Sequence, residues 1–234
     1  MQVLVLSCGR TGTNMLLEIM RGNSRLDATP FAEDKYLFQE SRALPDGYLS
    51  KCDTVYINNL EQIDELFKNN PLLRILFTVR DWRDCAMSKF YRGQPGQDNH
   101  IIADDATVNG CLEDLKWMET IHDYLTEKYF TNTLTVKMED IILDFDRTIE
   151  SICGFCALPF ERENMISFTE RYRNDFKSNR YKDIDKSQVK LYKRIDTVYE
   201  GFFKEDKNKK DINEVFDKIE PLLLKYGYES DYTI

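Results

Sequence analysis

A short apolar run, followed by a loop with two glycines, opens the chain. Residues Val3 to Leu6 are all apolar, and the loop Ser7 to Thr13 carries three hydroxyl side chains beside its glycines. Apolar residues from Met15 to Met20 then recur at helical spacing. This pattern is typical of a buried strand, a tight loop and a helix.

The loop predicts a site for an anion, most often a phosphate. Backbone N–H groups of such a loop converge beside the positive end of the helix dipole. The spacing differs from that of the nucleoside triphosphate P-loop, because Gly9 and Gly12 are three positions apart and no lysine follows Gly12. The cation, Arg10, lies inside the loop instead. This disfavours ATP or GTP with magnesium as the ligand.

Length and charge exclude several classes of protein. The chain has 234 residues and a formal net charge of −9. An acidic chain is a poor general binder of nucleic acid or of anionic membranes, so we expect neither partner. No apolar run approaches the roughly 18 residues of a membrane span. The first strand begins at residue 2, which leaves no room for a signal peptide, and we therefore expect a cytoplasmic protein.

Strands and helices alternate along the chain. Three further strands are predicted at Ser50–Ile57, Arg74–Val79 and Thr133–Val136, whereas residues 22–49 read as irregular with a short helix at Ala32–Phe38. Alternation of this kind predicts an α/β fold with a central parallel sheet between helical layers. We expect one domain over residues 1–234, with residues 162–234 as a helical portion or subdomain. Ligands of such sheets bind beyond the carboxyl ends of the strands. We therefore expect a site at the loops after Leu6, Ile57 and Val79.

A second anion site is predicted at the end of the strand Arg74–Val79. Arg80 follows this strand directly, and Asp81 and Asp84 open a helix that carries Ser88. An arginine at a strand end and a nearby serine hydroxyl suit a second phosphate.

These two stretches resemble the sulfotransferases that use 3′-phosphoadenosine 5′-phosphosulfate (PAPS). Arg10–Asn14 is similar to the loop that binds the 5′-phosphosulfate, and Arg80–Asp84 with Ser88 to the 3′-phosphate site. The segments Lys137–Ile141 and Leu224–Glu229 also resemble family segments. The resemblance implies a fold like that of P-loop nucleotide hydrolases, PAPS as the donor and adenosine 3′,5′-bisphosphate (PAP) as the product. The donor-binding residues that it implies are Gly9, Arg10, Thr11, Gly12, Thr13, Asn14, Arg80 and Ser88.

The resemblance also implies a mechanism. The acceptor, a hydroxyl or an amine of a small molecule, sugar or lipid, attacks sulfur in line, and Arg10 with help from Lys51 neutralises the leaving phosphate. No metal is expected, because these cations take that part. A hydroxyl acceptor needs a general base. Glu33 is the first candidate and Asp53 the second, followed by Glu40 and His100.

Two other functions remain open from the sequence alone. One is a P-loop-type kinase for small molecules, which the missing loop lysine disfavours. The other is a non-catalytic nucleotide-binding protein with the same fold. The basic stretch Ser178–Arg194 is either a flap over the anion or a solvated helical face.

The six cysteines read as buried, reduced thiols. Cys153 and Cys156 form a C-x-x-C pair, but it lies at the end of a predicted helix rather than at the start of one. We therefore expect neither a redox nor a metal role for this pair.

Overall fold

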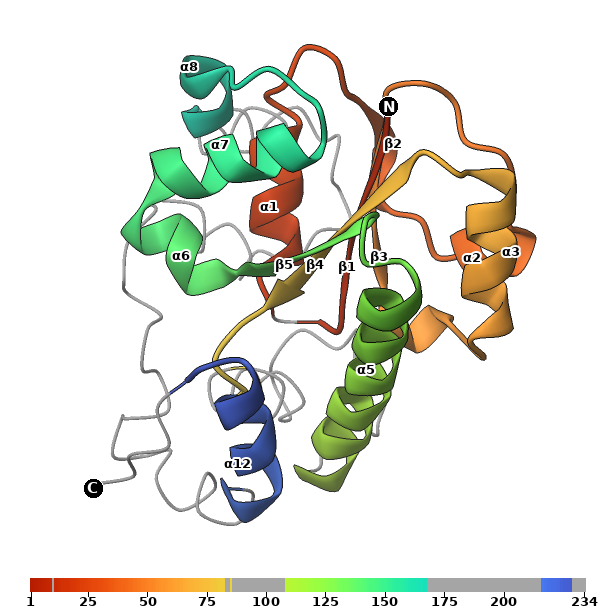
Figure 1. Cartoon of the computed structure of the whole chain (residues 1–234), viewed down its shortest axis with the longest axis vertical. Helices are drawn as coiled ribbons and strands as arrows, with labels where there is room; N and C mark the ends of the chain where they lie inside the picture. Colours follow the sequence, from red (N-terminus) through yellow and green to blue (C-terminus); the bar gives the residue numbers. More distant parts are fainter. Residues whose placement is uncertain (10, 83–84, 86–107, 168–215, 229–234) are drawn as a thin grey trace, which may run out of the picture.

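A parallel five-stranded sheet forms the centre of the computed structural model (Figure 1). The structure describes residues 1–9, 11–82, 85, 108–167 and 216–228. The strands are β1 (Gln2–Ser7), β2 (Asp27–Glu33), β3 (Tyr48–Asp53), β4 (Leu73–Val79) and β5 (Thr133–Lys137), in the order β2-β3-β1-β4-β5. Every pairing is parallel. The predicted fold class is thereby confirmed.

Helices cover both faces of this sheet, as Figure 1 shows. Because side chains alternate along a strand, Val3 and Val5 pack on one face and Leu4 and Leu6 on the other. The first face packs against α1 (Thr13–Met20), α6 (Met138–Leu143), α7 (Phe145–Phe155) and α8 (Arg162–Ile166). The second packs against α2 (Leu37–Glu40), α3 (Glu61–Asn69), α5 (Val108–Lys128) and α12 (Phe216–Lys225).

The prediction for residues 22–49 was wrong. This segment contains the edge strand β2, and its helix, α2, begins at Leu37 rather than at Ala32. The pairing of β2 with β3 shifts register between Ala28 and Glu33, and the strand contains Pro30. A proline is tolerated at a sheet edge, and a bulged, polar edge strand lacks the apolar signal of a central one.

The second predicted strand also needs correction. We expected Ser50–Ile57, but β3 ends at Asp53, and Thr54–Tyr56 form a 3₁₀ turn. The Asp53 carboxylate accepts a hydrogen bond from the Val55 N–H at 3.3 Å, which favours the turn over a continued strand. The prediction of one domain over 1–234 stays a prediction, and most of the proposed helical portion lies outside the described residues.

A buried hydrogen-bond chain ties α12 to the sheet. His122 on α5 bonds the Thr135 hydroxyl through Nε2 at 2.8 Å and the Tyr226 hydroxyl through Nδ1 at 3.0 Å. Burial lowers the pKa of His122 to about 4, and the charge of Lys225 acts in the same direction. The folded protein therefore holds this histidine as a neutral ring, which donates with one nitrogen and accepts with the other.

This histidine predicts a loss of stability in mild acid. Its pKa is about 4 in the folded chain against an ordinary value of 6.5, so the unfolded chain binds the extra proton between these values. Lowering the pH from about 7 to about 5 should therefore cost about 2 kcal/mol of unfolding free energy at this site. Urea unfolding of the native chain and of His122→Gln at both pH values measures it. Equal losses in the two proteins would contradict the assignment.

Candidate functional site

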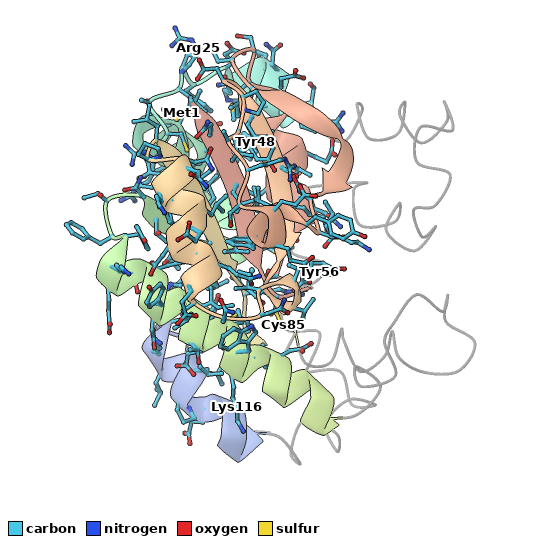
Figure 2. The ribbon with its side chains drawn as sticks, turned by 90° about the vertical axis from the view of Figure 1, so that its right-hand side faces the viewer. Met1, Arg25, Tyr48, Tyr56, Cys85 and Lys116 are labelled. Carbon is cyan, nitrogen blue, oxygen red and sulfur yellow. The ribbon has the colours of Figure 1, made fainter. Side chains whose placement is uncertain are left out.

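The carboxyl ends of β3, β1 and β4 lie side by side. Ser7 at the end of β1 is in register with Asp53 at the end of β3, and Leu6 is in register with Phe77 of β4. In Figure 2, Tyr56 and Cys85, which follow β3 and β4, lie toward the end of the sheet opposite Met1. The loops after these three strands therefore share one edge, as the sequence predicts.

The loop after β1 is fastened to β4 by a buried hydroxyl. Thr11 Oγ1 donates to the Cys8 carbonyl at 2.9 Å and shares a 2.8 Å hydrogen bond with Thr78 Oγ1. Thr11 is fully buried, so its hydroxyl holds the loop in shape. Its backbone N–H remains the group by which Thr11 could serve an anion. Arg10 lies outside the described residues.

Gly12 begins α1 in a conformation that favours glycine. Its φ is +88°, and a Cβ at this position would lie 2.9 Å from the sulfur of Met138. As the N-cap residue, Gly12 has no side chain that could cap α1. The N–H groups of the first helical turn, which includes Thr13 and Asn14, thus belong to a helix end of the kind that binds anions.

Two predicted catalytic residues meet across β2 and β3. Glu33 and Lys51 are in register on the two strands, and Lys51 Nζ lies 3.8 Å from Glu33 Oε1. Asp53 lies closer to the loop after β1, since its Oδ2 is 3.3 Å from the position that a Cβ of Gly9 would occupy. Glu40, by contrast, is an exposed residue paired with Arg42 at 2.7 Å.

The end of β4 contacts a residue that the sequence did not single out, Glu139. Arg80 and Asp81 are both buried there, and the Asp81 N–H donates to Glu139 Oε1 at 2.9 Å. Glu139 comes from α6, which follows β5. The segment Lys137–Ile141 is visible in the sequence, but the contact between its glutamate and β4 is not. Ser88, His100 and the basic stretch Ser178–Arg194 lie outside the described residues.

Five cysteines of the described residues are buried and form no disulfide: Cys8, Cys52, Cys85, Cys153 and Cys156. Burial raises the pKa of Cys153 to about 11 and that of Cys156 to about 12, which suppresses the reactive thiolate. Among the described residues, no group of three or more His, Cys, Asp or Glu side chains could hold a metal ion.

A cavity of about 400 Å³ lies away from the predicted site, at the outer edge of β5 against α6 and α7. Its lining includes Thr135, Lys137, Asp140 and Arg147, but none of the predicted donor-binding or catalytic residues. We therefore place the candidate site at the loops and not in this cavity.

In the described part of the chain, no helix is long and apolar enough to cross a membrane.

Comparison with known proteins decides the family. The sulfotransferase domain model matches residues 1–219. The chain belongs to the sulfotransferase family. The predicted resemblance and a transferase activity that uses PAPS are thereby confirmed, and a small-molecule kinase is disfavoured.

Solved structures share the fold of this sulfotransferase at low sequence identity. Mouse sulfotransferase SULT7A1, complexed with PAP, is 18% identical with a TM-score of 0.58, over 97% of this chain and 88% of that one. The sulfotransferase domain of the Synechococcus PCC 7002 olefin synthase is 14% identical with a TM-score of 0.54, over 92% and 94%. These likenesses show the fold alone. No curated protein sequence matches the chain.

Proposed function

We propose that the chain transfers a sulfuryl group from PAPS to a hydroxyl or amine acceptor by in-line displacement, leaving PAP. The observation that supports this proposal is that two segments suited to anions meet at one edge of the sheet. The glycine loop with the start of α1 follows β1, and Arg80 follows the adjacent strand β4. Family membership supplies the reaction, and this edge supplies the place for a donor with two separated phosphates.

The donor would lie along this edge with its 5′ end at the β1 loop. Gly9, Gly12 and the first turn of α1, with Thr13 and Asn14, offer backbone N–H groups to the phosphosulfate. Arg10 would neutralise the bridging oxygen as the sulfuryl group leaves, which electrostatic stabilisation requires. Arg80 and Ser88 would hold the 3′-phosphate.

The acceptor would approach from the side of β2 and β3. Glu33 is our first choice for the base that takes the acceptor proton, and its ion pair with Lys51 orients the carboxylate. Lys51 also brings a positive charge to this side of the site. Asp53 is the second choice, because its carboxylate lies beside Gly9 of the loop. The mechanism asks for no metal, since arginine and lysine carry the compensating charge.

The class of acceptor and the cellular location of the protein are further parts of this proposal. We propose a hydroxyl or amine of a small molecule, a sugar or a lipid as the acceptor. Five buried cysteines of the described residues form no disulfide, which supports a cytoplasmic location, where cysteines stay reduced.

Ligand-dependent stability tests the donor. At about 100 times its Kd, PAP should add about 2.7 kcal/mol to the free energy of unfolding, whereas ATP with magnesium should add nothing comparable. Thermal unfolding with each ligand measures the difference. Stabilisation by ATP with magnesium but not by PAP would overturn the proposed donor. A chain that binds PAP yet transfers sulfuryl to no acceptor would favour the non-catalytic alternative.

A further inference from the structure

The carboxylate of Glu139 joins three segments that are far apart in the sequence. Oε1 accepts the Asp81 N–H at 2.9 Å, directly after β4, and Oε2 accepts the Tyr228 hydroxyl at 2.9 Å, just beyond α12. Glu139 itself lies in the first turn of α6. Each carboxylate oxygen therefore holds a different segment, and the side chain fixes both to the end of β5.

The bond to Asp81 acts on the backbone of Arg80. The Asp81 N–H belongs to the peptide unit that follows the Arg80 Cα, and Glu139 holds this unit in place. β4 holds the chain on the other side of Arg80, so the Cα and the direction of its Cα–Cβ bond are fixed from both sides. Burial raises the pKa of the Glu139 carboxyl group, while its hydrogen bonds and then the Arg80 charge oppose that shift.

The bond to Tyr228 depends on how α12 ends. Gly227 has a φ of +69°, and the Tyr228 N–H donates back to the Leu223 carbonyl at 2.8 Å. This turn ends the helix with a left-handed glycine. It brings the Tyr228 hydroxyl to Glu139 and the Tyr228 ring to Lys137, whose Nζ lies 5.0 Å from the ring centroid.

Trp82, which follows β4, also packs against the segment that follows α12. Its fully buried ring packs edge-on against Tyr226, with the ring centroids 5.6 Å apart. The residues on either side of Asp81 are therefore both constrained, Arg80 through the peptide that Glu139 holds and Trp82 through its packing. The backbone between them has little freedom to turn.

We propose that Glu139 is a positioning residue for the donor, which sets the direction of Arg80 through the Asp81 N–H and is itself held by Tyr228. This inference rests on the proposed function, in which Arg80 binds the 3′-phosphate. It adds that recognition of this phosphate depends on a side chain that does not touch it. It also makes the end of α12 part of the donor site.

Two substitutions separate the effect of the length of the Glu139 side chain from that of its charge. Glu139→Asp keeps the charge but shortens the side chain by one methylene, so its carboxylate cannot span both partners. Glu139→Gln loses the charge but keeps the reach, and its amide oxygen still accepts the Asp81 N–H. Asp140→Asn, on the adjacent exposed carboxylate, is the matched control.

The readout is the ratio of Kd for adenosine 5′-phosphate, which lacks the 3′-phosphate, to Kd for PAP, measured by calorimetry. Loss of a bond that orients a charged group predicts about a tenfold lower ratio in Glu139→Asp. We expect a ratio about threefold lower in Glu139→Gln and an unchanged ratio in Asp140→Asn. A role in stability alone would weaken both ligands equally and leave the ratio unchanged.

The Arg80→Ala background completes the test. If Glu139 acts through Arg80, Glu139→Asp should lower the ratio no further in that background. An unchanged ratio in folded Glu139→Asp, or a larger drop in Glu139→Gln than in Glu139→Asp, would overturn the positioning role. If Glu139→Asp does not fold, Tyr228→Phe replaces it in the test. We expect about a threefold lower ratio in this variant, and an unchanged ratio would contradict the proposal. A native ratio near one would instead overturn the proposed donor itself.

Discussion

Replacing Glu33 by Gln should lower kcat by about 10²- to 10⁴-fold, the usual contribution of a general base. The amide keeps the shape of the side chain but cannot take the acceptor proton. The Kd for PAP should stay within about twofold, because Glu33 lies on the β2 side of the site and not among the donor-binding groups. Steady-state kinetics with an alcohol that the native enzyme turns over, together with PAP calorimetry, measure both quantities.

Two variants control this experiment. Glu65→Gln removes another glutamate that pairs with a lysine, Lys68 at 3.3 Å, on the exposed surface of α3, and kcat should not change. Asp53→Asn removes the second candidate base. Full activity in Glu33→Gln together with a large loss in Asp53→Asn would transfer the role to Asp53. Full activity in both would remove both from the chemistry.

Arg80→Ala should weaken PAP by about 100-fold and adenosine 5′-phosphate by less than about threefold, because a buried, charge-assisted contact to the 3′-phosphate is lost. The selectivity of the loss is the decisive part. A general disturbance of the β4 end would weaken both nucleotides. Calorimetry with the two ligands gives the two Kd values.

Arg74 offers a matched control on the same strand. It lies near the amino end of β4, donates to the Thr131 carbonyl at 2.9 Å and lies over the Phe155 ring. Arg74→Ala should cost stability without changing the preference for PAP. Arg80→Lys keeps the charge but loses the planar fork, and it should recover only part of the affinity. Equal losses of the two nucleotides in Arg80→Ala would remove Arg80 from the 3′-phosphate site.

The central strands could be predicted because burial on both faces leaves a plain apolar signal. Val3–Leu6 and Arg74–Val79 lie within β1 and β4, two of the three strands that have neighbours on both sides, with helices above and below. The two predicted anion-binding segments follow these same strands directly, so their places on one edge followed from the alternation of strands and helices.

The edge strand β2 was harder to predict, for a physical reason. It has one neighbouring strand, a register shift and a proline, so it lacks the continuous apolar run of a central strand. Without β2, the sequence did not show that Glu33 lies opposite Lys51. The sequence singled out each of the two residues separately. Their ion pair depends on the register between β2 and β3.

Glu139 was missed because its importance lies in contacts between distant segments. Its partners are 58 and 89 positions away in the chain. A glutamate in the first turn of a helix is common, since the helix dipole favours it there. The sequence therefore explained the residue locally, and only the folded chain shows both of its carboxylate oxygens in use.

The hydrogen bond between Thr11 and Thr78 has a consequence for which ligands fit. Thr11 belongs to the loop proposed for the 5′ end of the donor, and Thr78 lies two residues before Arg80 on β4. Because both hydroxyls are buried, their hydrogen bond ties the loop to the end of β4 at a fixed separation. On the proposed assignment, the enzyme selects nucleotides by the span between their phosphates as well as by their charge, and one that carries its second phosphate elsewhere on the ribose would reach only one of the two positions.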